Sequence, residues 1–175
     1  ALDAVLAYHG VKGYVWNKLF RRELIQRARA KFDTAIGMCE DLLFDVTCLV
    51  HAKRVYSMNR CLYNYRENPD SALHAIKPEV ARTCLIAHER MLGMVPETSR
   101  SAVQASDAIM AEEFLMRTYA SHDVRNRDDY YAVLRRYWRQ AFVREHSLKY
   151  RLRLVGGAWC PSLFYPMWNM LKGSN

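Results

Sequence analysis

Two adjacent carboxylates, Glu40 and Asp41, stand directly before an apolar run. The apolar residues that follow recur at the three- and four-residue spacing of a helix: Leu42, Val46, Leu49 and Val50. This pattern predicts a helix from Glu40 to about Ala52, with both carboxylates in the first turn, where free backbone N–H groups and the helix dipole favour the charged form. An ionised Asp41 held there could accept a proton from a hydroxyl group, as a general base does. The alternative is that both residues only cap the helix, since acidic residues are common in any first turn.

The elements that would position these carboxylates are predicted to be mainly α-helical with a few short β-strands. Val, Tyr and Trp residues favour extended structure in Gly13–Phe20 and Lys53–Arg66, where we expect strands. Pro78 is suited to begin a helix, and Gly156-Gly157 is expected to break one. The sequence pattern predicts helices in these approximate ranges: 1–10, 21–30, 40–52, 78–95, 101–121 and from 127 onward. A last short apolar segment begins at Pro161. We therefore expect a helical bundle toward the C-terminus.

Three segments together carry a resemblance to a known family. They read GYVWNKLFRREL at 13–24, GMCEDLLF at 37–44 and LYNYRENPDS at 62–71. In this order they resemble the C-terminal half of family 2 glycosyltransferases of the GT-A type, where a WNKLF segment precedes GEDLLF and then LYxYRxxxxS. The resemblance covers Lys12 to Ser71. It departs from the family pattern at Met38 and Cys39, which stand between Gly37 and Glu40.

The resemblance implies an inverting enzyme that transfers a sugar from a nucleotide-diphosphate sugar. A hydroxyl group of the acceptor would attack the anomeric carbon, and the nucleotide diphosphate would leave from the opposite face. The resemblance assigns Asp41 as the general base and Glu40 as the catalytic neighbour that caps the helix or orients the base. It also implies a bacterial enzyme of cell-surface polysaccharide or glycolipid synthesis, so the expected acceptor is a glycan or a lipid-linked molecule.

The same resemblance assigns further residues to substrate binding: Trp16, Lys18, Tyr65, Arg66 and Ser71. A Trp ring can stack on a sugar, a Lys ammonium can contact phosphate as a point charge, and an Arg guanidinium can bind phosphate in a bidentate manner. The alternatives are a Trp in the core, a solvated Lys, and an edge strand that carries an exposed Arg.

No metal site is expected from this chain, because its six His lack H-x-x-x-H spacing and it has neither an Asp-x-Asp pair nor a Gly-rich phosphate loop. In the resembled family an Asp-x-Asp pair upstream of the WNK segment holds Mg²⁺ or Mn²⁺ against the donor diphosphate. We therefore expect residues 1–75 to be the acceptor-side part of the catalytic domain and residues 76–175 to be a helical extension. The donor-binding half would lie upstream, and this piece alone would hold no cofactor and be inactive.

The net charge of +8 is concentrated near the C-terminus, where eight basic side chains between Arg135 and Asn175 oppose Glu145 alone. Residues 147–172 combine cations with Trp, Phe and Tyr, a composition typical of segments on anionic membrane surfaces. The alternative is a segment that covers its own domain. Two other functions stay open: a helical interaction module that docks on an anionic membrane, and a basic nucleic-acid-binding domain. The absence of any known nucleic-acid motif counts against the second, so no nucleic-acid partner is expected.

The cysteines and the hydropathy indicate where the protein would work. The five Cys form no C-x-x-C pair, which argues against a zinc site and against a disulfide framework. The sequence shows no signal peptide and no run of about 18 apolar residues. We expect a cytoplasmic protein that is peripheral on the inner face of the plasma membrane where residues 147–172 contact it.

Overall fold

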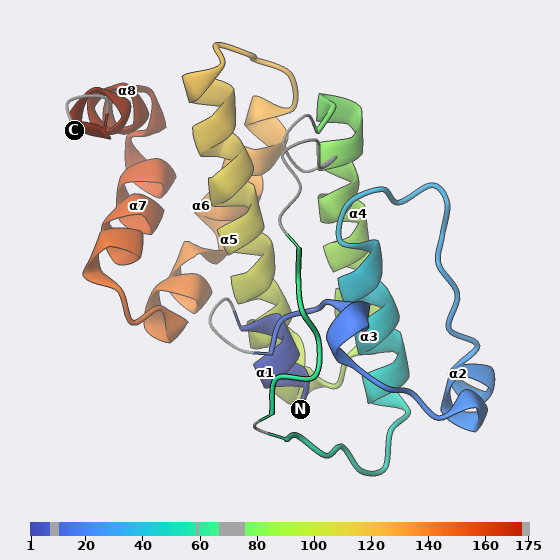
Figure 1. Ribbon diagram of the computed structural model, residues 1–175. Helices are drawn as coiled ribbons and strands as arrows, with labels where there is room; N and C mark the ends of the chain where they lie inside the picture. The colour runs from blue at the N-terminus through green and yellow to red at the C-terminus, as the bar shows by residue number, and fades with distance from the viewer. Residues whose placement is uncertain (8–10, 59, 67–75, 173–175) are drawn as a thin grey trace. The chain divides into compact units, whose positions relative to one another are not determined.

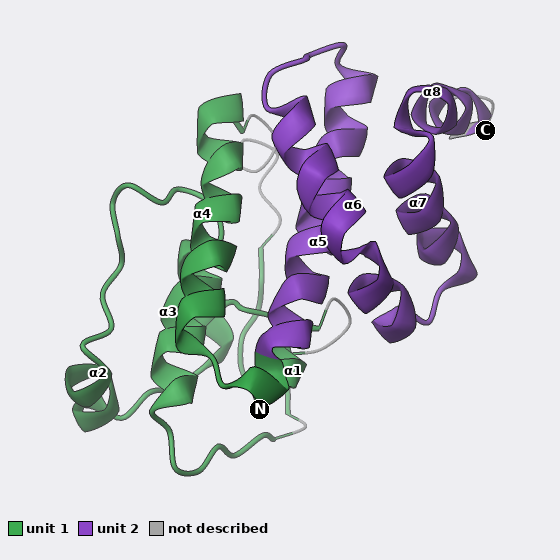
Figure 2. Ribbon diagram, turned by 180° about the vertical axis from the view of Figure 1, so that it is seen from behind, with its two compact units in different colours: residues 1–99 green, residues 100–175 purple. Residues whose placement is uncertain are grey.

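The computed structural model describes residues 1–7, 11–58, 60–66 and 76–172 (Figure 1). Within these ranges the chain is all-helical, and its elements in order are α1 (Leu2–Leu6), the 3₁₀ turn η1 (Val15–Asn17), α2 (Arg22–Ala28), α3 (Glu40–Val50), α4 (Pro78–Met94), α5 (Glu97–Ala120), α6 (Arg127–Arg144), α7 (Leu148–Trp159) and α8 (Pro161–Lys172). The chain divides into two compact units, residues 1–99 and 100–175 (Figure 2). Each unit is described by itself.

The mainly α fold class is confirmed, but the short strands are not, because none of the described residues forms a strand. The predicted strand at Gly13–Phe20 contains η1, and the described residues of Lys53–Arg66 have no regular structure. The β-propensity of aromatic and β-branched residues reflects packing on a pleated sheet surface. Here the aromatic side chains of these two segments stack on one another instead, so the same residues are satisfied without a ladder of backbone hydrogen bonds.

Helix α3 is the centre of the first unit and contacts α1, α2, α4 and η1. Its apolar run buries Leu42, Leu43, Phe44, Val46 and Cys48. The Phe44 ring stacks on Phe32 at 4.6 Å and meets the edge of Phe20 at 5.5 Å. The bounds of α3 confirm the predicted helix at 40–52 and place Glu40 and Asp41 in its first turn.

Helix α4 lies beside α3 and begins at Pro78, as predicted (Figure 1). Its buried face carries Ala81, Cys84, Ala87, His88 and Met91. Burial lowers the pKa of His88 to about 4, so this imidazole is neutral at pH 7. His88 Nδ1 lies 2.8 Å from the carbonyl oxygen of Cys84, and since a carbonyl only accepts, this nitrogen carries the proton.

In the second unit α5 and α6 run antiparallel. Their pairing is fixed by the stacked rings of Phe114 and Tyr130 at 5.5 Å and by a Gln140–Gln104 amide hydrogen bond. At the far end of the pair, the Arg144 guanidinium donates to the Ser101 hydroxyl at 2.9 Å.

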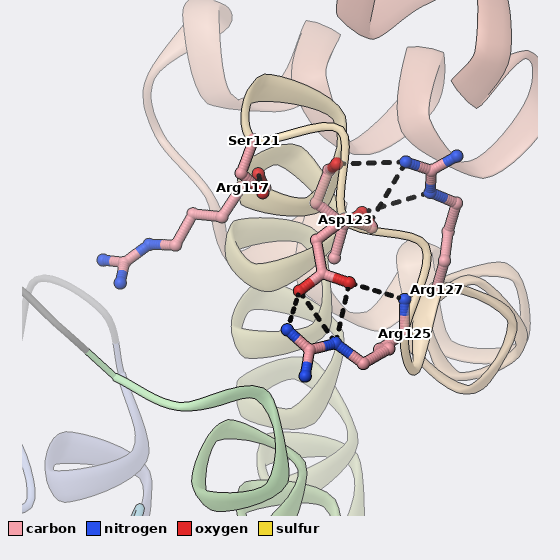
Figure 3. A network of polar contacts seen from close by, with 6 residues as sticks. Arg117, Ser121, Asp123, Arg125 and Arg127 are labelled. Atoms are coloured by element: carbon pink, nitrogen blue, oxygen red, sulfur yellow. Dashed lines mark hydrogen bonds and ion pairs between the residues drawn. The ribbon is translucent and has the colours of Figure 1, made fainter.

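The turn between α5 and α6 is held by charged side chains (Figure 3). Asp123 accepts hydrogen bonds from the Arg125 backbone N–H at 2.9 Å and from Arg125 Nη2 at 2.8 Å. These hydrogen bonds lower the pKa of the Asp123 carboxyl. Arg127 donates to the carbonyl oxygens of Thr118 and Asp123, so it ties the start of α6 to the end of α5. The Ser121 hydroxyl donates to the carbonyl of Arg117 at 2.9 Å and closes the last turn of α5.

The predicted break at Gly156-Gly157 is wrong, because both glycines lie inside α7. Their role is to let α8 approach. A Cβ atom added at Gly156 would lie 2.3 Å from Phe164 Cδ2, and one added at Gly157 would lie 2.1 Å from the Tyr165 hydroxyl oxygen. Tyr165 is fully buried, and its hydroxyl donates to Glu112, which also pairs with the buried Arg153. The contact with α8 therefore outweighs the low helix propensity of two glycines.

Candidate functional site

The loop before α2 is joined to α3 at two points. The Lys18 ammonium lies 3.0 Å from Asp45 Oδ2, and the Val15 N–H faces Asp41 Oδ2 at 3.5 Å. Asp41 and Asp45 are four residues apart on α3, so both lie on the face that meets the loop. The ion pair is deep in the first unit, since the Asp45 side chain is 0% exposed.

Asp45 is a central residue that the sequence analysis missed. Burial raises the pKa of its carboxyl, and the Lys18 ammonium opposes this shift. A signal was present in the sequence, because Asp45 interrupts the run Leu42-Leu43-Phe44 and Val46. A carboxylate inside an apolar run is stable only with a partner, and its position one turn after Asp41 marks the same helix face.

Several oxygen atoms surround the Lys18 ammonium group. Besides the Asp45 carboxylate, it contacts the carbonyl oxygens of Lys12 at 2.7 Å and Tyr14 at 2.8 Å, and Asn17 Oδ1 at 2.8 Å. These contacts fold residues 12–18 around one cation. Phosphate binding by Lys18 stays a prediction, and it would require this ammonium to exchange some of these oxygens for the ligand.

Gly13 lets this loop lie directly on the first turn of α3. A Cβ atom at Gly13 would be 2.4 Å from Leu42 Cδ1 and 2.8 Å from Leu42 Cα. The second of these atoms belongs to the helix backbone and cannot rotate away. Only glycine therefore permits this approach, which brings the loop within reach of Asp41.

Asp41 is half-buried in the first turn of α3, as the sequence predicted for its position in the helix. Among the described residues its carboxylate has no ion pair, and Oδ1 has no hydrogen-bond donor. The neighbouring Glu40 is also half-buried, and burial, together with the negative charge of Asp41, raises the pKa of the Glu40 carboxyl. An uncompensated carboxylate oxygen at a helix start is able to accept a proton. The catalytic roles of Asp41 and Glu40 stay predictions.

Four aromatic side chains contact one another and form what we call the aromatic cluster: Tyr14, Trp16, Tyr63 and Tyr65. Trp16 is at its centre, with ring centroids 5.1 Å from Tyr14, 4.6 Å from Tyr63 and 5.5 Å from Tyr65. All four side chains are exposed. Trp16 follows Val15, whose N–H faces Asp41, so the cluster and the carboxylate are held by the same loop.

The structure brings Trp16 and Tyr65 together, although Tyr65 comes from a distant segment of the chain, and it pairs Lys18 with Asp45 of α3. Arg66 is exposed directly after Tyr65. Ser71 lies outside the described residues. Substrate binding by these five residues stays a prediction.

Cys39 stands at the point where the sequence departs from the resembled motif. It precedes Glu40 directly, at the place where the GEDLLF pattern has glycine, and its backbone is left-handed with φ of 66°. A side chain disfavours this conformation because Cβ approaches the backbone. Cys39, not Gly37, therefore occupies the position that calls for glycine.

Replacing Cys39 with glycine is expected to stabilise the first unit by about 1 kcal/mol, since the strain at the positive φ is removed. Urea unfolding of the 175-residue chain measures this change. Cys61→Gly, at an exposed position in an irregular segment, is the matched control and is expected to give no gain. A Cys39→Gly variant that is less stable than the parent would contradict the assignment.

Neither a metal centre nor a membrane span is built from the residues that the structure describes. They contain no group of three or more His, Cys, Asp or Glu side chains that could hold a metal ion. No helix in those ranges combines the length and the apolar character that crossing a bilayer requires. The Mg²⁺ or Mn²⁺ ion that the resemblance implies for the whole enzyme, at an Asp-x-Asp pair upstream of the WNK segment, stays a prediction.

Comparison with known proteins supports a relation to glycosyltransferases over part of the chain. A stretch of 58 residues is 47% identical to the uncharacterized glycosyltransferase EpsJ of Bacillus subtilis (strain 168). It covers 33% of this chain and 17% of that protein, so the similarity is partial on both sides. No family model matches the chain, and no solved structure matches it. The narrower family 2 and GT-A assignments stay predictions.

Proposed function

We propose that residues 12–71 belong to the acceptor side of an inverting family 2 glycosyltransferase and that Asp41 is its general base. The observation that carries this proposal is the shared loop: the Val15 N–H faces Asp41 in the first turn of α3, and the next residue of the same loop is the exposed Trp16. Sugars stack on exposed aromatic rings, and their hydroxyl groups need a nearby carboxylate to be deprotonated. The partial similarity to a glycosyltransferase supports the same reaction class.

In the proposed reaction an acceptor hydroxyl lies within hydrogen-bond reach of Asp41. Its oxygen forms a bond to the anomeric carbon of the nucleotide-diphosphate sugar while its proton passes to the Asp41 carboxylate. The bond from that carbon to the diphosphate oxygen breaks, and its electron pair leaves with the nucleotide diphosphate. Glu40 orients the first turn of α3, and the Lys18–Asp45 pair positions the loop.

The other partners follow from the same proposal. The nucleotide sugar and the Mg²⁺ or Mn²⁺ ion would be bound by another part of the enzyme. Residues 1–75 would complete the acceptor side of the catalytic domain, with residues 76–175 as a helical extension. The acceptor is a glycan or a lipid-linked molecule of a bacterial cell-surface polysaccharide or glycolipid.

The experiment that tests this function is sugar transfer by the full-length protein with a panel of nucleotide-diphosphate sugars and glycan acceptors. Trp16→Leu is expected to raise the acceptor KM about tenfold with little change in kcat, because the ring contributes to ground-state and transition-state binding alike. Tyr56→Leu is the matched control, since Tyr56 is 86% exposed and lies outside the aromatic cluster.

Two results would count against the proposal. Absence of transfer from every donor by the parent protein would reject the reaction class. An acceptor KM that Trp16→Leu and Tyr56→Leu leave equally unchanged would reject the aromatic cluster as the acceptor site while leaving the reaction class in place.

A further inference from the structure

One face of α8 exposes apolar side chains at helical spacing. Leu163, Met167, Met170 and Leu171 are between 55% and 75% exposed. At 3.6 residues per turn they fall within an arc of about 100°. The adjoining arc of the helix carries the buried Tyr165 and the half-buried Phe164 and Trp168, and the rings of Phe164 and Trp168 stack at 5.4 Å. The second unit therefore uses one side of α8 for its own packing and leaves the other apolar side in solvent.

Helix α7 adds a second exposed apolar stripe. Leu148, Leu152 and Trp159 follow one another at four and seven residues, and each is more than half exposed. Cations lie beside them: Lys149 is exposed, and the Arg135 guanidinium is 3.9 Å from the centroid of the Trp159 ring. Apolar and basic side chains are thus interleaved on the surface of the second unit.

No acidic residue opposes these cations in the C-terminal segment. The sequence has no Asp or Glu after Glu145, and Glu145 itself is buried. Such a surface complements an anionic partner. The exposed Leu and Met side chains also require an apolar environment, which the phosphates of nucleic acid do not offer but the acyl region of a bilayer does.

We propose that α8 lies in the plane of an anionic lipid bilayer, with Leu163, Met167, Met170 and Leu171 inserted at the boundary between headgroups and acyl chains. Its twelve residues span about 18 Å, less than the hydrocarbon core of about 30 Å, so the helix rests on the membrane and does not cross it. Arg135 and Lys149 contact anionic headgroups. This inference goes beyond the proposed function and does not depend on it.

Sedimentation of the 175-residue chain with vesicles tests the proposal. The chain is expected to bind vesicles of 30% phosphatidylglycerol in phosphatidylcholine at least tenfold more tightly than pure phosphatidylcholine vesicles, because headgroup charge adds to apolar burial. The triple variant Leu163→Gln, Met167→Gln and Leu171→Gln is expected to lose at least tenfold in binding to the anionic vesicles. These side chains are exposed, so circular dichroism should show an unchanged helix content.

Control variants distinguish membrane binding by the apolar face of α8 from binding by positive charge alone. Val124→Gln removes an exposed apolar side chain in the α5–α6 turn and is expected to bind vesicles like the parent. Arg135→Gln with Lys149→Gln is expected to weaken binding several-fold to anionic vesicles only. Equal binding of the parent and the triple variant would overturn the proposal. So would binding to duplex DNA without binding to anionic vesicles, since that result would reveal a charge effect alone.

Discussion

Replacing Asp41 with asparagine in the full-length protein is expected to reduce kcat for sugar transfer by a factor of about 10² to 10⁴, the usual contribution of a general base. Asparagine has nearly the same shape and can still accept a hydrogen bond from the Val15 N–H, so the loop should keep its place. Its amide cannot take up the proton of the acceptor hydroxyl. The measurement is the initial rate of transfer at saturating donor and acceptor, together with the dissociation constant of the nucleotide sugar.

The controls for this variant address the two neighbouring roles. Nucleotide-sugar binding should stay within about twofold of the parent value, because Asp41 acts on the acceptor and not on the donor. Glu40→Gln should cost no more than about tenfold in kcat if Glu40 orients the helix start and does not accept the proton. Transfer at the parental rate by Asp41→Asn would reject Asp41 as the base. A complete loss of sugar transfer in Glu40→Gln would indicate that Glu40, and not Asp41, is the general base.

The second large effect is expected from Lys18→Met. This change removes the ammonium that accompanies a carboxylate with no solvent exposure and leaves Asp45 as an uncompensated buried charge. Breaking a buried ion pair in this way costs about 3–5 kcal/mol. Urea unfolding of the 175-residue chain measures the loss. Lys18→Met should also disturb the loop of the candidate functional site, because residues 12–18 fold around the same ammonium.

The pH dependence of this loss has a definite sign. Burial already raises the pKa of Asp45 above 3.8 in the parent, and without Lys18 no ammonium opposes that shift. A carboxyl whose folded-state pKa is raised stabilises the fold below its unfolded pKa and loses this stabilisation as the pH rises through the folded value. Lys18→Met should therefore be least damaging near pH 4 and most damaging at neutral pH.

Two comparisons make the assignment of this pair specific. Lys18→Met combined with Asp45→Asn removes the buried charge and should recover a large part of the stability lost in the single variant. Arg90→Met breaks the exposed ion pair with Asp33 in the same unit and should cost much less, since solvent screens that pair. Equal losses in Lys18→Met and Arg90→Met would show that the Lys18–Asp45 pair is not a buried structural contact.

The predictions from sequence were most accurate for helices whose bounds are determined by neighbouring residues. The apolar spacing after Asp41 predicted the start and the extent of α3, and Pro78 predicted the start of α4. In each of these cases the deciding interactions join residues within a few positions of one another, so a single segment contains the information.

Contacts between distant segments were decided by tertiary structure alone. Lys18 and Asp45 are separated by most of the loop and α2, and nothing in either segment specifies the other as its partner. Tyr63 and Tyr65 were predicted in a strand but pack against the Trp16 ring, because aromatic side chains that favour sheets are equally satisfied by other apolar rings. Gly156 and Gly157 were predicted to end a helix, yet they continue α7 because Phe164 and Tyr165 occupy the space that side chains would fill.

The sequence by itself determined the helical character of the chain, the carboxylates at the start of α3 and the acid-free, aromatic C-terminal segment. Only the folded structure decided that a buried Lys18–Asp45 pair holds the loop on that helix, and that α8 buries one apolar side while exposing the other. The physical reason is that helix formation depends on neighbours in the chain. The burial of a charge, the stacking of a ring and the exposure of a helix face depend on which distant residues arrive beside them.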